Sequence, residues 1–153
     1  MCAGICDVSH EISQGAFFTF MREKLIFKEK KSILIVDDEP GFHHMFRFLL
    51  EPMGIDVSSA YDGLEGLESF KKGHFDLILS DVHMPKMPGP ELFDRIREIK
   101  PDQLVIVMSS GSDPDYNFEK EAQNKGAVAC LYKPFEVNQI IDVIEKALNK
   151  GNP

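Results

Sequence analysis

The chain has 153 residues, with 17 Lys and Arg against 25 Asp and Glu, so its formal net charge is -8. That length suits one domain, or one domain with an extension. The acidic balance argues against broad contact with nucleic-acid phosphates or with an anionic membrane surface, since both favour a basic face. No run of about 18 apolar residues is present, so no membrane-spanning helix is predicted.

The three cysteines, Cys2, Cys6 and Cys130, cannot all pair within the chain. Their number and placement do not make a disulfide framework, and free cysteines are typical of a reducing compartment. We therefore expect a cytoplasmic protein.

Residues 1–30 differ from the rest of the chain. They show no sustained period before a stretch that mixes aromatic and charged residues. This pattern predicts an N-terminal extension that is either a short amphipathic helix or disordered. A regular pattern begins at Lys31, and we expect one domain over residues 31–150.

From Lys31 onward, short apolar runs alternate with amphipathic segments. The expected strands are 33–36, 55–59, 75–79, 104–108 and 127–131. The expected helices are 42–50, 64–72, 92–99, a weakly amphipathic one beginning near Pro114, and 137–148. All strands but the second are continuous apolar runs, which are typical of strands buried on both faces. Single helices between strands predict a parallel α/β sheet with helices on both faces.

Polar side chains stand where four of these strands end. Asp37 and Asp38 follow the first strand, Asp81 the third, Ser109 the fourth and Lys133 the fifth. Ligand sites of such sheets lie beyond the carboxyl ends of the strands. We therefore expect three carboxylates, a hydroxyl and an ammonium to meet at one edge of the sheet.

A cluster of three carboxylates is unfavourable by itself. At about 5 Å and an effective dielectric constant near 20, each pair repels by roughly 3 kcal/mol. Mg²⁺ relieves that repulsion, because it prefers carboxylate oxygens and keeps several waters. With Lys133 and Ser109 binding an incoming anion, such a site can accept a phosphoryl group on a carboxylate nucleophile.

Four segments, ILIVDDEP, LILSDVHMP, VIVMSSG and YKPF, resemble the receiver domain of two-component response regulators in order and spacing, over about residues 31–150. The resemblance, closest to stand-alone regulators of the chemotaxis type, implies a flavodoxin-like, doubly wound sheet of five parallel strands in the order 2-1-3-4-5. It implies a switch that takes a phosphoryl group from a sensor histidine kinase or phosphotransfer protein and signals to a downstream protein target. Such a protein catalyses only its own phosphorylation and dephosphorylation.

The resemblance also implies a role for each polar residue. The implied Mg²⁺ site consists of Asp37, Asp38, Asp81 and the backbone carbonyl of His83. Of the three carboxylates, those of Asp38 and Asp81 are implied to contact the ion directly. Asp81 is the implied phosphoacceptor, and Ser109 and Lys133 contact the phosphoryl group. The peptide bond between Lys133 and Pro134 is usually cis in the family.

One position departs from the family pattern. Three residues before the lysine the family usually has Tyr or Phe, whose ring turns inward on activation, and here that residue is Cys130. A small side chain cannot report the state of Ser109 by swinging a ring. Tyr132 lies on the same side of the strand and is the alternative.

Other functions stay open at this point. The chain could be a receiver module from a larger regulator. An aspartyl-nucleophile phosphatase generally carries a second Asp two residues after the first, where this chain has His83. A flavin or dinucleotide module needs a phosphate loop rich in Gly, Ser or Thr after the first strand, where this chain has two acids.

Overall fold

The computed structural model describes residues 15–16, 19, 27, 29–111 and 118–150. The extension predicted over residues 1–30 lies largely outside them, as does the predicted helix start near Pro114. Among the described residues, none of the helices combines the length and the apolar run that crossing a bilayer needs.

Five parallel strands form one sheet in the order β2-β1-β3-β4-β5, which confirms the predicted order 2-1-3-4-5. The strands are β1 (Lys31–Val36), β2 (Ile55–Ala60), β3 (Leu77–Asp81), β4 (Val105–Ser109) and β5 (Ala129–Tyr132). The direction of strand addition reverses between β1 and β3. After β1 the chain continues to β2 on one side of the sheet, and after β3 it continues to β4 on the other side, so the ends of β1 and β3 lie side by side where the two connections separate.

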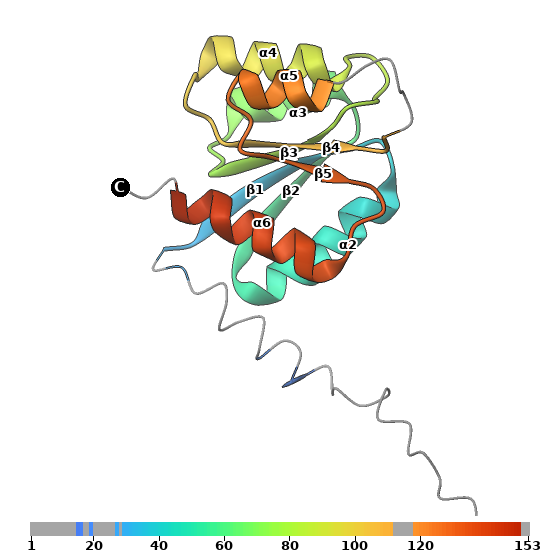
Figure 1. The fold of residues 1–153 in the computed structure, drawn as a ribbon. Coiled ribbons are helices and arrows are strands. Elements are labelled where there is room, and N and C mark those ends of the chain that lie inside the picture. Colours follow the sequence, from blue (N-terminus) through green and yellow to red (C-terminus); the bar gives the residue numbers. More distant parts are fainter. Residues whose placement is uncertain (1–14, 17–18, 20–26, 28, 112–117, 151–153) are drawn as a thin grey trace, which may run out of the picture.

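Helices cover both faces of the sheet (Figure 1). They are α2 (Pro40–Leu50) with the short 3-10 helix η1 (Glu51–Met53), α3 (Gly63–Lys72), α4 (Gly89–Ile99), α5 (Phe118–Asn124) and α6 (Val137–Lys150). Helices α2 and α6 lie on one face, and α3, α4 and α5 on the other. A hydrophobic cluster lies on each face of the sheet, and alternate residues of β1 belong to each cluster. Ile33 and Ile35 pack towards α2 and α6, and Leu34 and Val36 pack towards the other face.

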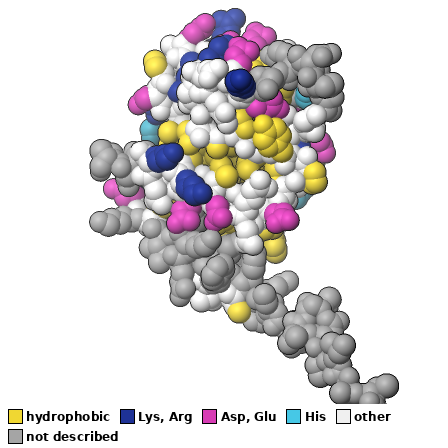
Figure 2. All heavy atoms as spheres, in the orientation of Figure 1, with side chains coloured by type: hydrophobic (Ala, Val, Ile, Leu, Met, Phe, Trp, Pro, Cys, Tyr) yellow, Lys and Arg dark blue, Asp and Glu magenta, His cyan; other side chains and the backbone are white. Residues whose placement is uncertain are grey.

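The central strands are buried, but the fifth is not. Every residue of β3 and β4 is buried, as are the last four of β1. The expectation that the fifth strand is buried on both faces is wrong, because β5 pairs with β4 alone and forms an edge. Its Tyr132 is 52% exposed. Figure 2 shows the molecule from the side of this edge strand, with hydrophobic side chains gathered across the middle of the view, where β5 lies between α5 and α6.

Two strands extend to the polar residues themselves. The third strand was expected over 75–79 and the fourth over 104–108, but β3 ends at Asp81 and β4 at Ser109. The ladder continues because Asp81 pairs with Met108 and Ser109 with Tyr132. These two polar side chains are therefore held by the sheet rather than by flexible loops.

The loop that joins β3 to α4 packs tightly under Asp81. The Gly89 N–H donates to the Val82 carbonyl over 2.9 Å, and a Cβ on Gly89 would overlap the Asp81 carbonyl oxygen. Lys86, in the left-handed region with a φ of 67°, places its ammonium 2.8 Å from Asp62 at the start of α3. The loop is therefore packed closely against the backbone of Asp81.

We predict that Gly89→Ala lowers the free energy of unfolding by about 1–3 kcal/mol, because the added methyl group forces the backbone at Asp81 to shift. Urea denaturation would measure this. Gly41→Ala is the matched control, since no atom lies within 4 Å of its Cβ position and Ala favours the helix by up to about 1 kcal/mol. Equal effects of the two changes would contradict the close packing at Gly89.

Candidate functional site

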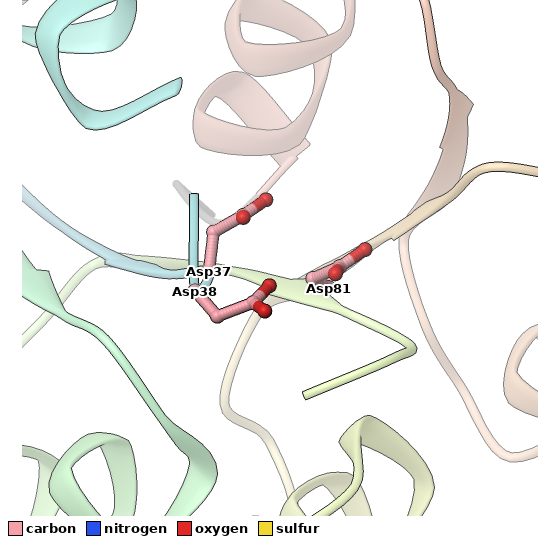
Figure 3. A group of neighbouring side chains, drawn as sticks. All are labelled: Asp37, Asp38 and Asp81. Atoms are coloured by element: carbon pink, nitrogen blue, oxygen red, sulfur yellow. The ribbon is translucent and has the colours of Figure 1, made fainter. Parts of the chain in front are cut away.

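Three carboxylates meet at the neighbouring ends of β1 and β3. Asp37, Asp38 and Asp81 each offer one oxygen, and these oxygens all lie within 4.8 Å of one another (Figure 3). They meet because β1 pairs directly with β3, with Val36 opposite Ser80. The structure thus brings together the three acids that the sequence predicted.

The three carboxylates differ in their surroundings. Asp37 is fully buried and Asp81 is 5% exposed, whereas Asp38 faces solvent. The Asp37 carboxylate accepts a hydrogen bond from the Glu39 N–H at 2.9 Å, and its backbone carbonyl is 2.6 Å from Nε2 of the buried His43. The inner side of the cluster is therefore fixed by the fold, and its outer side, at Asp38, is open to a ligand.

Lys133 supplies a positive charge to the cluster. Its Nζ is 2.7 Å from Oδ2 of Asp37 and 3.4 Å from Oδ1 of Asp81, and its side chain is 10% exposed. Burial lowers the pKa of this ammonium, but its hydrogen bond to Asp37 and the charges of Asp81 and Asp37 outweigh that effect and raise the pKa above its ordinary value. Lys133 is therefore charged at neutral pH.

The ammonium does not fully compensate Asp81. Burial, opposed by the charge of Lys133 and reinforced by that of Asp37, raises the pKa of Asp81 to about 6. The folded chain without a cation thus disfavours the ionised form of this carboxyl. Hard oxygen donors with excess negative charge suit a divalent cation such as Mg²⁺, so the cluster could hold one.

Ser109 lies at the end of β4, buried to 97%. Its Oγ accepts a hydrogen bond from the Gly111 N–H at 3.1 Å, and its carbonyl accepts one from the Lys133 N–H at 2.7 Å. The peptide bond from Lys133 to Pro134 is cis, as predicted. The main chains that carry the predicted hydroxyl and ammonium are therefore joined directly.

The remaining predicted residues lie at the margin of the cluster. His83, two residues beyond Asp81, has an exposed side chain, and the role of its carbonyl as a metal ligand stays a prediction. Cys130 is partly buried, with Sγ 3.6 Å from the Glu119 carbonyl. Burial, with a contribution from Glu119, raises the pKa of the Cys130 thiol to about 11, so it is neutral at physiological pH.

Sequence reasoning missed two neighbours of Lys133. The Phe42 ring centroid lies 4.0 Å from Nζ, and Oε1 of Glu39 lies 3.7 Å away. The periodic pattern placed Phe42 only on the buried face of a helix, and it carried no signal for a cation above the ring. Glu39 could have been noticed as a third acid after the pair Asp37-Asp38.

Comparisons with known proteins agree with this geometry. Residues 33–145 match the model of the response regulator receiver domain. The chain is 33% identical over 122 residues to the transcriptional regulatory protein GlrR of Escherichia coli (strain K12), covering 79% of this chain and 27% of that protein. It is 31% identical over 118 residues to sporulation initiation phosphotransferase F of Bacillus subtilis (strain 168), and the match covers 77% of this chain and 94% of that protein.

Among solved structures, the CheY-like response regulator receiver domain protein from Methanospirillum hungatei JF-1 matches with a TM-score of 0.74 and 28% identity, over 80% of this chain and 97% of that one. The chain spans only about a quarter of the length of the GlrR protein. Fold, sequence match and structural likeness lead to one conclusion: the chain belongs to the response regulator receiver domain family of two-component systems.

Proposed function

We propose that this chain is a phosphorylation-controlled switch that accepts a phosphoryl group on Asp81 and signals through protein contacts. The observation that carries the proposal is the position of Asp81. Its carboxylate ends β3 beside Asp37 and within 3.4 Å of the Lys133 ammonium. A carboxylate held by the sheet beside both a cation site and an ammonium is placed to act as a nucleophile towards phosphorus.

In this proposal Asp37, Asp38, Asp81 and the carbonyl of His83 hold Mg²⁺. When bound, Mg²⁺ offsets the negative charge of the carboxylates and of the phosphoryl oxygens. The fit rests on the donor set, which consists of carboxylate oxygens with only one compensating ammonium.

The chain's own residues divide the remaining work. An Asp81 oxygen forms a bond to phosphorus while the bond from phosphorus to the donor nitrogen breaks, and the nitrogen keeps that electron pair. Lys133 donates to a phosphoryl oxygen and holds its charge, and the Ser109 hydroxyl donates to another. The product is an acyl phosphate on Asp81, which water later hydrolyses.

The proposed partners are a sensor histidine kinase or a phosphotransfer protein, and a downstream protein target. The proposed switch comprises residues 31–150. Its net charge of -8 favours output through protein contact rather than direct nucleic-acid binding. As a phosphoacceptor, the chain would catalyse only its own phosphorylation and dephosphorylation.

We predict that incubation of the chain with Mg²⁺ and acetyl phosphate adds the mass of one phosphoryl group. Intact mass spectrometry would measure this, and removal of Mg²⁺ by a chelator should abolish the gain. Asp81→Asn should not gain the mass, whereas Asp94→Asn, on the exposed side of α4, should gain it as the wild type does. A phosphorylated Asp81→Asn protein would show that the acceptor is another residue.

We also predict that Asp81→Asn stabilises the chain in the absence of Mg²⁺. Because the pKa of Asp81 is raised to about 6, the folded chain holds an unfavourable charge at pH 7–8. Removing that charge should raise the free energy of unfolding by about 1–2 kcal/mol, after allowance for partial solvation. The gain should shrink as the pH falls below 6, since the wild type then takes up the proton that neutralises Asp81.

Urea denaturation at pH 8, 6 and 4 would test this prediction. Asp38→Asn is the control, because Asp38 is exposed and its neutralisation should give a smaller gain. Saturating Mg²⁺ should stabilise the wild type more than Asp81→Asn. A loss of stability in Asp81→Asn at pH 8 without Mg²⁺ would contradict the electrostatic account of the cluster.

A further inference from the structure

The Lys133 ammonium has an aromatic partner as well as acidic ones. Phe42, in the first turn of α2, presents its ring with the centroid 4.0 Å from Nζ. The face of an aromatic ring carries negative potential and attracts a cation within about 6 Å. The ammonium therefore has three kinds of contact: a hydrogen bond to Asp37, an ion pair with Asp81 and the Phe42 ring.

The orientation of the Phe42 ring is held by other aromatic side chains. Phe135, just beyond the cis peptide bond, meets Phe42 edge-on, with centroids 5.6 Å apart and planes at 61°. Phe135 in turn packs 6.2 Å from the ring of Phe46, which is fully buried between the sheet and α2. The ring above Lys133 is thus connected to the hydrophobic core.

Glu39 competes for the same ammonium. Its Oε1 lies 3.7 Å from Nζ, and its side chain is 64% exposed, so it draws Lys133 towards solvent. A lysine side chain has a flexible four-carbon stem and can follow such a pull. Once a divalent cation neutralises Asp37 and Asp81 becomes an acyl phosphate, those two carboxylates hold the ammonium less strongly, and a phosphoryl oxygen becomes its acceptor. Glu39 keeps its charge and Phe42 keeps its ring.

We propose that Phe42 is a positioning residue, whose ring keeps the Lys133 ammonium over the carboxylate cluster while a cation and a phosphoryl group occupy the carboxylates. This inference rests on the proposed function, because the ring acts on the phosphoryl group only through Lys133. The ring supplies an attraction that neither a cation nor a phosphoryl group can neutralise, and it opposes the movement of Lys133 towards Glu39.

The test measures binding of beryllofluoride, a phosphoryl mimic, to the full chain in saturating Mg²⁺ by titration calorimetry. Phe42→Leu and Phe42→Met, which fill similar space without a ring, should weaken binding by about three- to tenfold. Phe42→Tyr and Phe42→Trp, which keep a ring face, should bind within about twofold of the wild type. Phe48→Leu, the same change at an exposed position of α2, should leave binding unchanged.

The order of beryllofluoride affinities among the variants tests the role of the Phe42 ring. Equal binding by all the Phe42 variants, or equal losses in the aromatic and aliphatic ones, would overturn the proposal. A loss in Phe48→Leu as large as that in Phe42→Leu would also overturn it, because the effect would then belong to the helix as a whole.

A second measurement separates this inference from the proposed function. In the metal-free chain, the ring should shift the ε-methylene proton resonances of Lys133 upfield, and Phe42→Leu should abolish that shift while Phe42→Tyr retains it. An unshifted wild-type resonance would refute the ring contact itself. If the shift is present but the wild type neither binds beryllofluoride nor accepts phosphate from acetyl phosphate, the proposed function fails, and with it the role assigned to Phe42.

Discussion

The repulsion among the carboxylates at the ends of β1 and β3, which Lys133 offsets only in part, determines the chemistry of the site. Three carboxylates have oxygens within 4.8 Å of one another, and each ionised pair costs about 3 kcal/mol at an effective dielectric constant near 20. Lys133 compensates one charge, and two remain. The cost appears in the raised pKa of Asp81. A divalent cation would restore neutrality, so the groups that strain the metal-free fold are also those that favour a ligand.

The topology of the sheet imposes this arrangement. Parallel strands deliver their carboxyl ends to one edge, and the direct pairing of β1 with β3 places Asp37 beside Asp81. The backbone behind Asp81 cannot retreat, because Gly89 packs against its carbonyl with no room for a Cβ. Asp37 and Asp81 are both buried, so these two carboxylates have little room to move apart and depend on the ammonium, a proton or a cation.

Much of this could be predicted from the sequence, because apolar runs that end in acids are a local signal. The acidic cluster and the place of Lys133 followed from such runs, and the strand order followed from the family resemblance. The exposure of β5 did not, since an apolar run looks the same in an edge strand as in a central one. The contact of Phe42 with Lys133 could not be predicted either. The periodicity of a helix shows which of its faces is buried, but it does not show which side chain of another element packs against that face.

With Cys130 at the position where the family usually has an aromatic residue, the proposed switch would need another connection between the site and the surface. The thiol is small, and its raised pKa keeps it neutral, so it offers neither a ring to rotate nor a charge to attract. The Lys133 N–H, however, donates to the Ser109 carbonyl over 2.7 Å. Under the proposed function both residues would contact the phosphoryl group, so a shift of Ser109 towards it would move the end of β5 through the backbone. Tyr132, which pairs with Ser109 in the ladder and is half-exposed, would carry that movement to the surface.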